Sequence, residues 1–375
     1  MTYQHALRYL TLPDTTSSGN TRALLRAYVS QTKAAPPLFI HFTANKLGHT
    51  TALFLQGALA QAGISCLHWI DDAATEPKLR FRLDGKPITP PLLARLAGEL
   101  HGMETTSPDV TLGDAERCAA LLCRLAAEEG CRVVLLESMQ ETPVLPVFCA
   151  IHPRLNAIAV LSDKKDVVSD TIRSNVRLVI TPTYGPAFYR RISDACAASN
   201  IRLEIIKKSS RTAVTLGAQT LSYGKFPDCR IASGSSLVAT AAFLAMECVQ
   251  TLTRMRFSID TAALQNGLRT ADLSHALHLR CIQPLLLSDI VTTDEELLLS
   301  LADISELCPH LPAPRRLWLE DSLSDPPPQF AALFDEICRN GTEPCLLPEG
   351  TTLAIGCAAF VDAFIKNALR KPKKS

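Results

Sequence analysis

Residues 38–51 read LFIHFTANKLGHTT, and this stretch is the strongest indication of fold class in the chain. Its first five residues form a short apolar run that is typical of a buried strand, and polar residues follow as a turn. The pattern then predicts a helix from about Thr50 to Ala62. Strand, polar loop and helix in this order form the layout of a phosphate-binding loop, in which backbone N–H groups at the start of the helix face an anion.

Strands and helices alternate through the rest of the chain. Residues 65–70 form a second predicted strand, which completes a β-α-β unit of the parallel, right-handed kind. The strand predicted at residues 132–137 is apolar until Glu137 at its carboxyl end, where ligand groups of open α/β sheets gather. The sequence therefore predicts an α/β fold of the P-loop type, with a mostly parallel sheet and flanking helices.

A second, smaller α/β domain is expected near the carboxyl end. A chain of 375 residues suggests two domains at ~150 residues each, and the alternating pattern weakens between Arg269 and Cys281. We predict an ATPase-like domain over residues 1–272 and a Rossmann-like domain over residues 282–375. The second domain is predicted to contain helices at 294–301, 330–340 and 358–369. Residues 214–223 alternate well enough to form an antiparallel strand pair or an edge.

Composition argues against several function classes. The 38 Lys and Arg balance the 37 Asp and Glu, so no overall charge draws the chain to nucleic acid or anionic lipid. The 13 cysteines are scattered without a Cys-x-x-Cys pair, which favours buried thiols in a reducing compartment over a zinc site. No charged and apolar leader opens the chain, and no apolar run approaches the ~20 residues that span a bilayer. We expect a cytoplasmic protein without a membrane or nucleic-acid partner.

Isolated histidines and serines add no catalytic pattern. His41, His68 and the other histidines form no HxxxH or HExxH spacing, and a lone histidine is usually structural or exposed. A Gly-x-Ser-x-Gly motif is absent. Ser235 or Ser236 is expected to cap the long helix predicted at residues 236–253.

The order of these elements resembles the folylpolyglutamate synthase and dihydrofolate synthase family, a branch of the ATP-dependent Mur ligases. The resemblance rests on the opening helix Tyr3–Leu10, the loop at 43–50, the Asp84–Lys86 turn, the strand ending in Glu137 and the segment 227–242 before a long helix. It covers nearly the whole chain in order and spacing. The resemblance implies a two-domain ligase fold, ATP and Mg²⁺ as cofactors, and a folate-like carboxylate with glutamate as substrates.

The resemblance also implies site residues. It suggests nucleotide contacts for Asn45, Lys46, Gly48, His49, Thr50 and Thr51, and metal contacts for Thr50 and Glu137. The family loop is close to Gly-Thr-Asn-Gly-Lys-Gly-Ser-Thr, in which glycines admit the phosphates, lysine offsets their charge and a hydroxyl binds Mg²⁺. Here Thr43 and Lys46 replace two glycines, Leu47 stands at the lysine position and His49 replaces the serine.

Two lysines are candidates to restore lost charge. Lys46 fits a phosphate role if the loop is one residue shorter than the family loop. Lys164 stands where the family has a metal-binding histidine, and one hypothesis is that its ammonium partly replaces Mg²⁺; the competing interpretation is a surface lysine. In the ligase domain, Asp289 is the acidic residue that remains near the family's aspartate position.

These departures fall in the phosphate loop, the metal positions, the start of the nucleotide helix and the ligase-domain aspartate. Such groups act together to stabilise one transition state, so a single neighbouring residue does not compensate for the loss of all of them. Our first hypothesis is a folylpolyglutamate-synthase-like protein without ordinary ATP-driven ligation, which binds a nucleotide, a folate-like molecule or a protein partner. The alternatives are a divergent active ligase that adds glutamate through an acyl phosphate, and an unrelated α/β enzyme.

Overall fold

The structure is a computed structural model that describes residues 1–11, 20–31, 36–43, 45–70, 77–138, 157–160, 176–182, 185–206, 209–273, 276–283, 285–339 and 349–369. The chain forms two compact units, which comprise Met1–Ile206 with Leu244–Gly267, and Lys207–Phe243 with Leu268–Ser375. The second unit thus includes residues 207–243, which the sequence analysis assigns to the first domain. The predicted division into 1–272 and 282–375 stays a prediction.

The first unit is built on an eight-stranded sheet in the order β4-β3-β2-β5-β1-β6-β7-β8. Its strands are β1 (Leu38–Thr43), β2 (Cys66–Ile70), β3 (Phe81–Leu83), β4 (Lys86–Pro87), β5 (Val133–Ser138), β6 (Ala157–Val160), β7 (Val176–Thr181) and β8 (Arg202–Ile205). The strands from β2 to β8 along this order pair in parallel, and β3 with β4 adds an antiparallel hairpin. Asp84 and Gly85 form its turn with positive φ angles, which a type I′ turn requires. The predicted mostly parallel sheet is confirmed.

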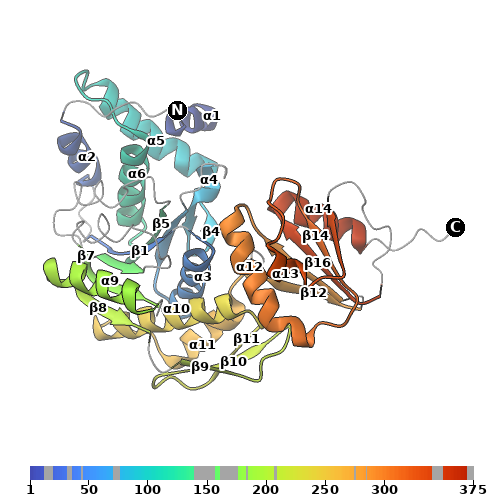
Figure 1. The fold of residues 1–375 in the computed structure, drawn as a ribbon. Coiled ribbons are helices and arrows are strands. Elements are labelled where there is room, and N and C mark those ends of the chain that lie inside the picture. The colour runs from blue at the N-terminus through green and yellow to red at the C-terminus, as the bar shows by residue number, and fades with distance from the viewer. Residues whose placement is uncertain are drawn as a thin grey trace. The chain divides into compact units, whose positions relative to one another are not determined.

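Helices cover both faces of this sheet (Figure 1). They are α1 (Tyr3–Leu10), α2 (Thr21–Val29), α3 (Lys46–Gln61), α4 (Pro77–Arg80), α5 (Pro90–Thr105), α6 (Asp114–Glu128) and α9 (Pro186–Ala198), with parts of α10 (Ser236–Arg254) and α11 (Thr261–Thr270). Helices α1, α2, α5 and α6 share one apolar core with Phe39, Leu67 and Trp69. Helix α3 packs against β1, β2 and β5 from the other face.

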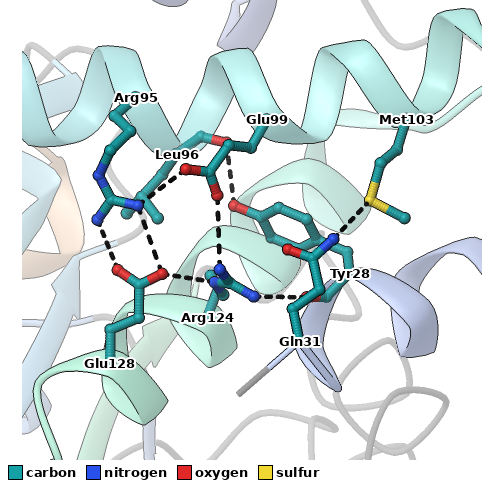
Figure 2. Close-up of polar contacts among 8 residues, drawn as sticks. All are labelled: Tyr28, Gln31, Arg95, Leu96, Glu99, Met103, Arg124 and Glu128. Atoms are coloured by element: carbon teal, nitrogen blue, oxygen red, sulfur yellow. Dashed lines mark hydrogen bonds and ion pairs between the residues drawn. The ribbon is translucent and has the colours of Figure 1, made fainter.

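Polar contacts fix α2 on α5 and α6, as Figure 2 shows. The Tyr28 hydroxyl donates to the carbonyl oxygen of Leu96 at 3.0 Å. The Arg124 guanidinium donates to the Tyr28 carbonyl at 3.1 Å and lies 5.6 Å from the centre of the Tyr28 ring. Glu128 accepts from Arg95 at 2.5 Å and from Arg124 at 2.6 Å. The amino-terminal helices are therefore held on the sheet face that lies opposite α3.

The second unit contains a five-stranded sheet, β12-β13-β16-β14-β15, and a three-stranded antiparallel sheet, β11-β10-β9. The elements are β9 (Ser209–Thr212), β10 (Gln219–Tyr223), β11 (Cys229–Ile231), β12 (His278–Ile282), β13 (Leu285–Ile290), α12 (Asp294–Leu307), the 3₁₀ turn Cys308–His310, β14 (Arg315–Leu319), α13 (Pro328–Ala331), β15 (Glu336–Arg339), β16 (Thr351–Gly356) and α14 (Ala358–Ala368). Strands β13 to β15 in this order pair in parallel. The predicted smaller α/β domain is confirmed. Of residues 214–223, expected as an antiparallel strand pair or an edge, 219–223 form the central strand of the antiparallel sheet, and both partner strands lie outside this range.

The predicted helix over residues 330–340 is wrong. Helix α13 ends at Ala331, and β15 then pairs in parallel with β14 through the Leu317 and Ile337 register. Pairing with a neighbouring strand outweighs local propensity in a segment this short. The sequence pattern of the segment alone could not show that neighbour.

Helix α10 comes closer to membrane-spanning length than the sequence analysis expects. It has 19 residues and is apolar enough to meet the length and composition of a membrane span. However, 72% of the apolar stretch of this helix is buried inside the fold, which is typical of the core helix of a soluble protein. Its apolar character is explained by packing.

Candidate functional site

The candidate site lies at the carboxyl ends of three neighbouring parallel strands. Ile70 on β2, Glu137 on β5 and Phe42 on β1 stand in register across the sheet. Helix α3 starts three residues after β1 ends. Carboxyl ends of parallel strands are where α/β folds collect ligand groups, so the topology brings the predicted loop and Glu137 to one edge.

Asn45 determines where α3 begins. Its backbone is extended, with φ −145° and ψ 172°, and its side-chain oxygen accepts a hydrogen bond from the N–H of Gly48 at 2.8 Å. This is an N-cap contact, in which the asparagine satisfies a donor at the helix end. The helix therefore starts at Lys46, about four residues earlier than predicted. The structure thus brings Asn45 and Gly48 together, and the contact between them is this capping hydrogen bond.

The two threonines of the loop use their hydroxyls within α3. The Thr50 hydroxyl donates to the carbonyl of Lys46, and the Thr51 hydroxyl donates to the carbonyl of Leu47, each at 2.7 Å. Both threonines are fully buried, and Lys46 is 6% exposed. Back-bonding of this kind is common for threonine inside helices. The hydroxyl that the sequence analysis assigns to a metal thus bonds to its own helix.

Glu137 lies between two histidines. The Nδ1 atom of His49 is 2.8 Å from Oε2 and 2.9 Å from Oε1 of Glu137, and Nε2 of His68 is 2.5 Å from Oε1. A carboxylate is an acceptor, so both imidazoles donate. Glu137 is 2% exposed and His68 is fully buried. The structure therefore places a His-Glu-His cluster at the end of β5.

The two imidazoles keep this carboxylate ionised despite its burial. Burial alone would raise the pKa of Glu137. The charges of His49 and His68 and their hydrogen bonds lower this pKa by more than burial raises it, so it lies below that of an ordinary glutamate. A buried carboxylate is costly unless it is paired and hydrogen-bonded. Here imidazole N–H groups meet that requirement for both oxygens.

Sequence reasoning missed His68. It treats His68 as an isolated histidine in an apolar strand, whereas the register pairs His68 with Leu135, two residues before Glu137. Residues two apart in a strand share one face, so His68 and Glu137 both point toward α3. The signal that could have found the contact is the parallel pairing of β2 with β5, because it places His68 and Glu137 on one face of two adjacent strands, two positions apart in register.

The arrangement does not fit a Mg²⁺ ion held by Thr50 and Glu137. Magnesium prefers oxygen ligands in near-octahedral geometry. The Glu137 oxygens accept from two histidines, and the Thr50 hydroxyl is turned to a backbone carbonyl. Across the described ranges, no three or more His, Cys, Asp or Glu side chains are grouped so that they could hold a metal.

The remaining sequence candidates lie elsewhere. Lys164 falls outside the described residues. Asp289 belongs to the second unit, where it is 1% exposed and accepts from the Ser300 hydroxyl at 2.5 Å. Ser235 caps α10 as predicted, because its hydroxyl oxygen accepts from the N–H of Val238 at 3.1 Å.

Solved folylpolyglutamate synthases have the same architecture. The apo enzyme of Lactobacillus casei gives a TM-score of 0.74 at 13% identity, covering 98% of this chain and 99% of that chain. The fold is that of folylpolyglutamate synthases. The Thermotoga maritima enzyme gives a TM-score of 0.72 at 12% identity, covering 97% and 96%, and the Mycobacterium tuberculosis enzyme, complexed with ADP and AMPPCP, gives 0.69 at 12%, covering 99% and 100%. No protein-family model and no curated protein matches the chain.

Proposed function

We propose that this chain is a folylpolyglutamate-synthase-like protein that does not carry out Mg²⁺- and ATP-dependent ligation and acts by binding a small molecule or a protein partner. The observation that carries the proposal is the His-Glu-His cluster. Its imidazoles take the Glu137 oxygens that a metal would need. Without a cation at that position, the negative charge that develops during phosphoryl transfer lacks its main neutralising group.

The loop before α3 supports the same proposal. Leu47 stands at the family's lysine position and is buried. The N–H of Gly48 is used by Asn45, and both threonine hydroxyls are used inside the helix. Contacts of Asn45, Lys46, Gly48, His49, Thr50 and Thr51 with a nucleotide stay a prediction of the resemblance, because both threonines are fully buried and their hydroxyls and the Gly48 N–H already have partners within the chain. These loop residues provide neither the lysine nor the metal ligands at the positions that the resemblance requires for ligation.

The ligand class is proposed from solved structures of the same fold. Folylpolyglutamate synthase has been solved with AMPPCP, and with AMPPCP together with folate. A nucleotide or folate-like carboxylate is therefore the first ligand to test on this chain. The cysteines among the described residues carry free thiols, which supports a reducing compartment such as the cytoplasm. The overall charge of +1 gives no support to a nucleic-acid partner.

Turnover measurement tests the proposal. The full chain is incubated with ATP, Mg²⁺, glutamate and a reduced folate, with an active folylpolyglutamate synthase as the positive control. We expect phosphate release at the rate of the blank and no glutamylated folate by mass spectrometry. Glutamate-dependent phosphate release together with a glutamylated product would establish the divergent active ligase and overturn the proposal.

A further inference from the structure

Residues of the second unit close the N-terminus of α10. The first two N–H groups of this helix, those of Ser236 and Leu237, both point to Oδ1 of Asp303, at 2.5 and 3.4 Å. The Ser236 hydroxyl donates to the same oxygen at 2.8 Å. The third N–H group, that of Val238, donates to the Ser235 hydroxyl. The N–H groups that a helix start usually offers to an anion are thus taken by the chain itself.

Asp303 is well suited to this position. It lies on α12, 67 residues from Ser236 in the sequence, and it is 4% exposed. A carboxylate at a helix N-terminus is favoured by the partial positive charge of that end, and hydrogen bonds to a charged acceptor are stronger than neutral ones. Three donors converge on one buried oxygen, so the contact satisfies a charge that would otherwise be costly to bury.

An ion pair on α12 adds a second connection, to β9 and to the segment before α10. Glu306 follows Asp303 by three residues, so both side chains stand on one face of α12. Arg211 on β9 pairs with Glu306 at 2.9 Å and donates to the carbonyl of Gly234 at 2.8 Å. Arg211 therefore connects α12 to the segment that leads into α10.

The backbone at this junction is closely packed. A Cβ atom added to Gly234 would lie 1.9 Å from the carbonyl oxygen of Thr215 and 3.2 Å from the Leu307 side chain. Glycine is therefore required where the segment passes between the β9–β10 connection and the end of α12.

We propose that Asp303 is an internal anion that occupies the N-terminus of α10 and, together with the Glu306–Arg211 pair, fastens α12 to the three-stranded sheet. The contact also accounts for the grouping of residues 207–243 with the carboxyl-terminal sheet. The inference concerns a different part of the chain from the His-Glu-His cluster and stands without the proposed function.

Hydrogen exchange of the full chain tests this proposal. In Asp303→Ala we expect the amides of Ser236 and Leu237 to exchange about five- to tenfold faster, the factor that corresponds to loss of a capping contact. Asp294→Ala is the matched control, because Asp294 lies on the same helix but accepts from Ser324 instead. It should leave both amides unchanged. Asp303→Asn keeps an acceptor without the charge and should give a smaller increase, which keeps the test available if the alanine variant does not fold.

Results of two kinds would overturn the proposal. One is unchanged exchange of Ser236 and Leu237 in both Asp303 variants, or an equal increase in Asp294→Ala. The other is protection of these amides in the wild-type chain by added inorganic phosphate, because this would show that the helix start is open to an external anion. We expect phosphate to leave them unchanged.

Discussion

Replacing His68 with leucine removes one of the two imidazoles that hold Glu137. His68 is fully buried on β2, and its Nε2 lies 2.5 Å from Oε1 of Glu137. Leucine has about the same volume as histidine, so the main loss is the hydrogen bond to the carboxylate. In the variant, Glu137 keeps His49 as its partner among the described residues.

The expected magnitude follows from the burial of both groups. Removing a partner of a buried charged group costs about 3–5 kcal/mol, and we expect a loss of this order because both buried Glu137 oxygens then depend on a single imidazole, that of His49. This corresponds to a roughly 10²- to 10⁴-fold change in the unfolding equilibrium. Replacing both partners with apolar residues removes that charge as well. The double variant His68→Leu/Glu137→Leu should therefore be more stable than the sum of the two single losses predicts, with a coupling free energy of about 2 kcal/mol.

Urea unfolding measures this cycle in the first unit. The chain has two tryptophans, Trp69 on β2 and Trp318 on β14. In a Trp318→Phe background, the fluorescence of the buried Trp69 reports on the first unit alone. The reasoning is refuted if the two single losses add to the double loss within about 0.5 kcal/mol, which is the behaviour of independent sites.

Three further predictions concern the first unit. Burial lowers the pKa of His41 to about 4, so the unfolded chain binds more protons below pH ~6.5; stability should fall by up to about 3 kcal/mol toward pH 4, and a His41→Gln variant with the same pH dependence would contradict this cause. Gly267→Ala would bring a Cβ atom to 2.3 Å from the nitrogen of Ala58 and should lower the unfolding free energy by about 1–3 kcal/mol. The control Gly102→Ala, where a Cβ atom meets nothing within 4 Å, should raise it by roughly 0.5–1 kcal/mol; equal effects would refute the packing argument. Tyr28→Phe removes the hydroxyl bond to α5 and should cost about 0.5–1.5 kcal/mol in the same urea assay, whereas an unchanged midpoint would show that this bond does not stabilise the unit.

Much of the fold follows from local sequence pattern. The apolar run at 38–42, the Asp84-Gly85 turn and the apolar strand before Glu137 each predict an element that the structure contains. The start of α3 was displaced because Asn45, a residue of the expected loop, caps the helix. The strand β15 was missed because its pairing with β14 is a tertiary contact.

The candidate site was less predictable. The sequence places Glu137 at a strand end and His49 in the loop, but their contact with His68 depends on the strand order β2-β5-β1. The contact of Asp303 with α10 likewise joins residues 67 positions apart. Both carboxylates are satisfied by partners that no local spacing indicates.

The most direct test of the account is the effect of Mg²⁺ on the stability of the first unit. The free energy of unfolding is measured by Trp69 fluorescence in the Trp318→Phe background, with ATP present, as Mg²⁺ is raised from zero to about 10 mM. Because His49 and His68 already hold the Glu137 oxygens, we predict no Mg²⁺-dependent change. A rise approaching ~2.7 kcal/mol, the value for a ligand at 100 times its dissociation constant, would show that a metal site persists and would contradict the account.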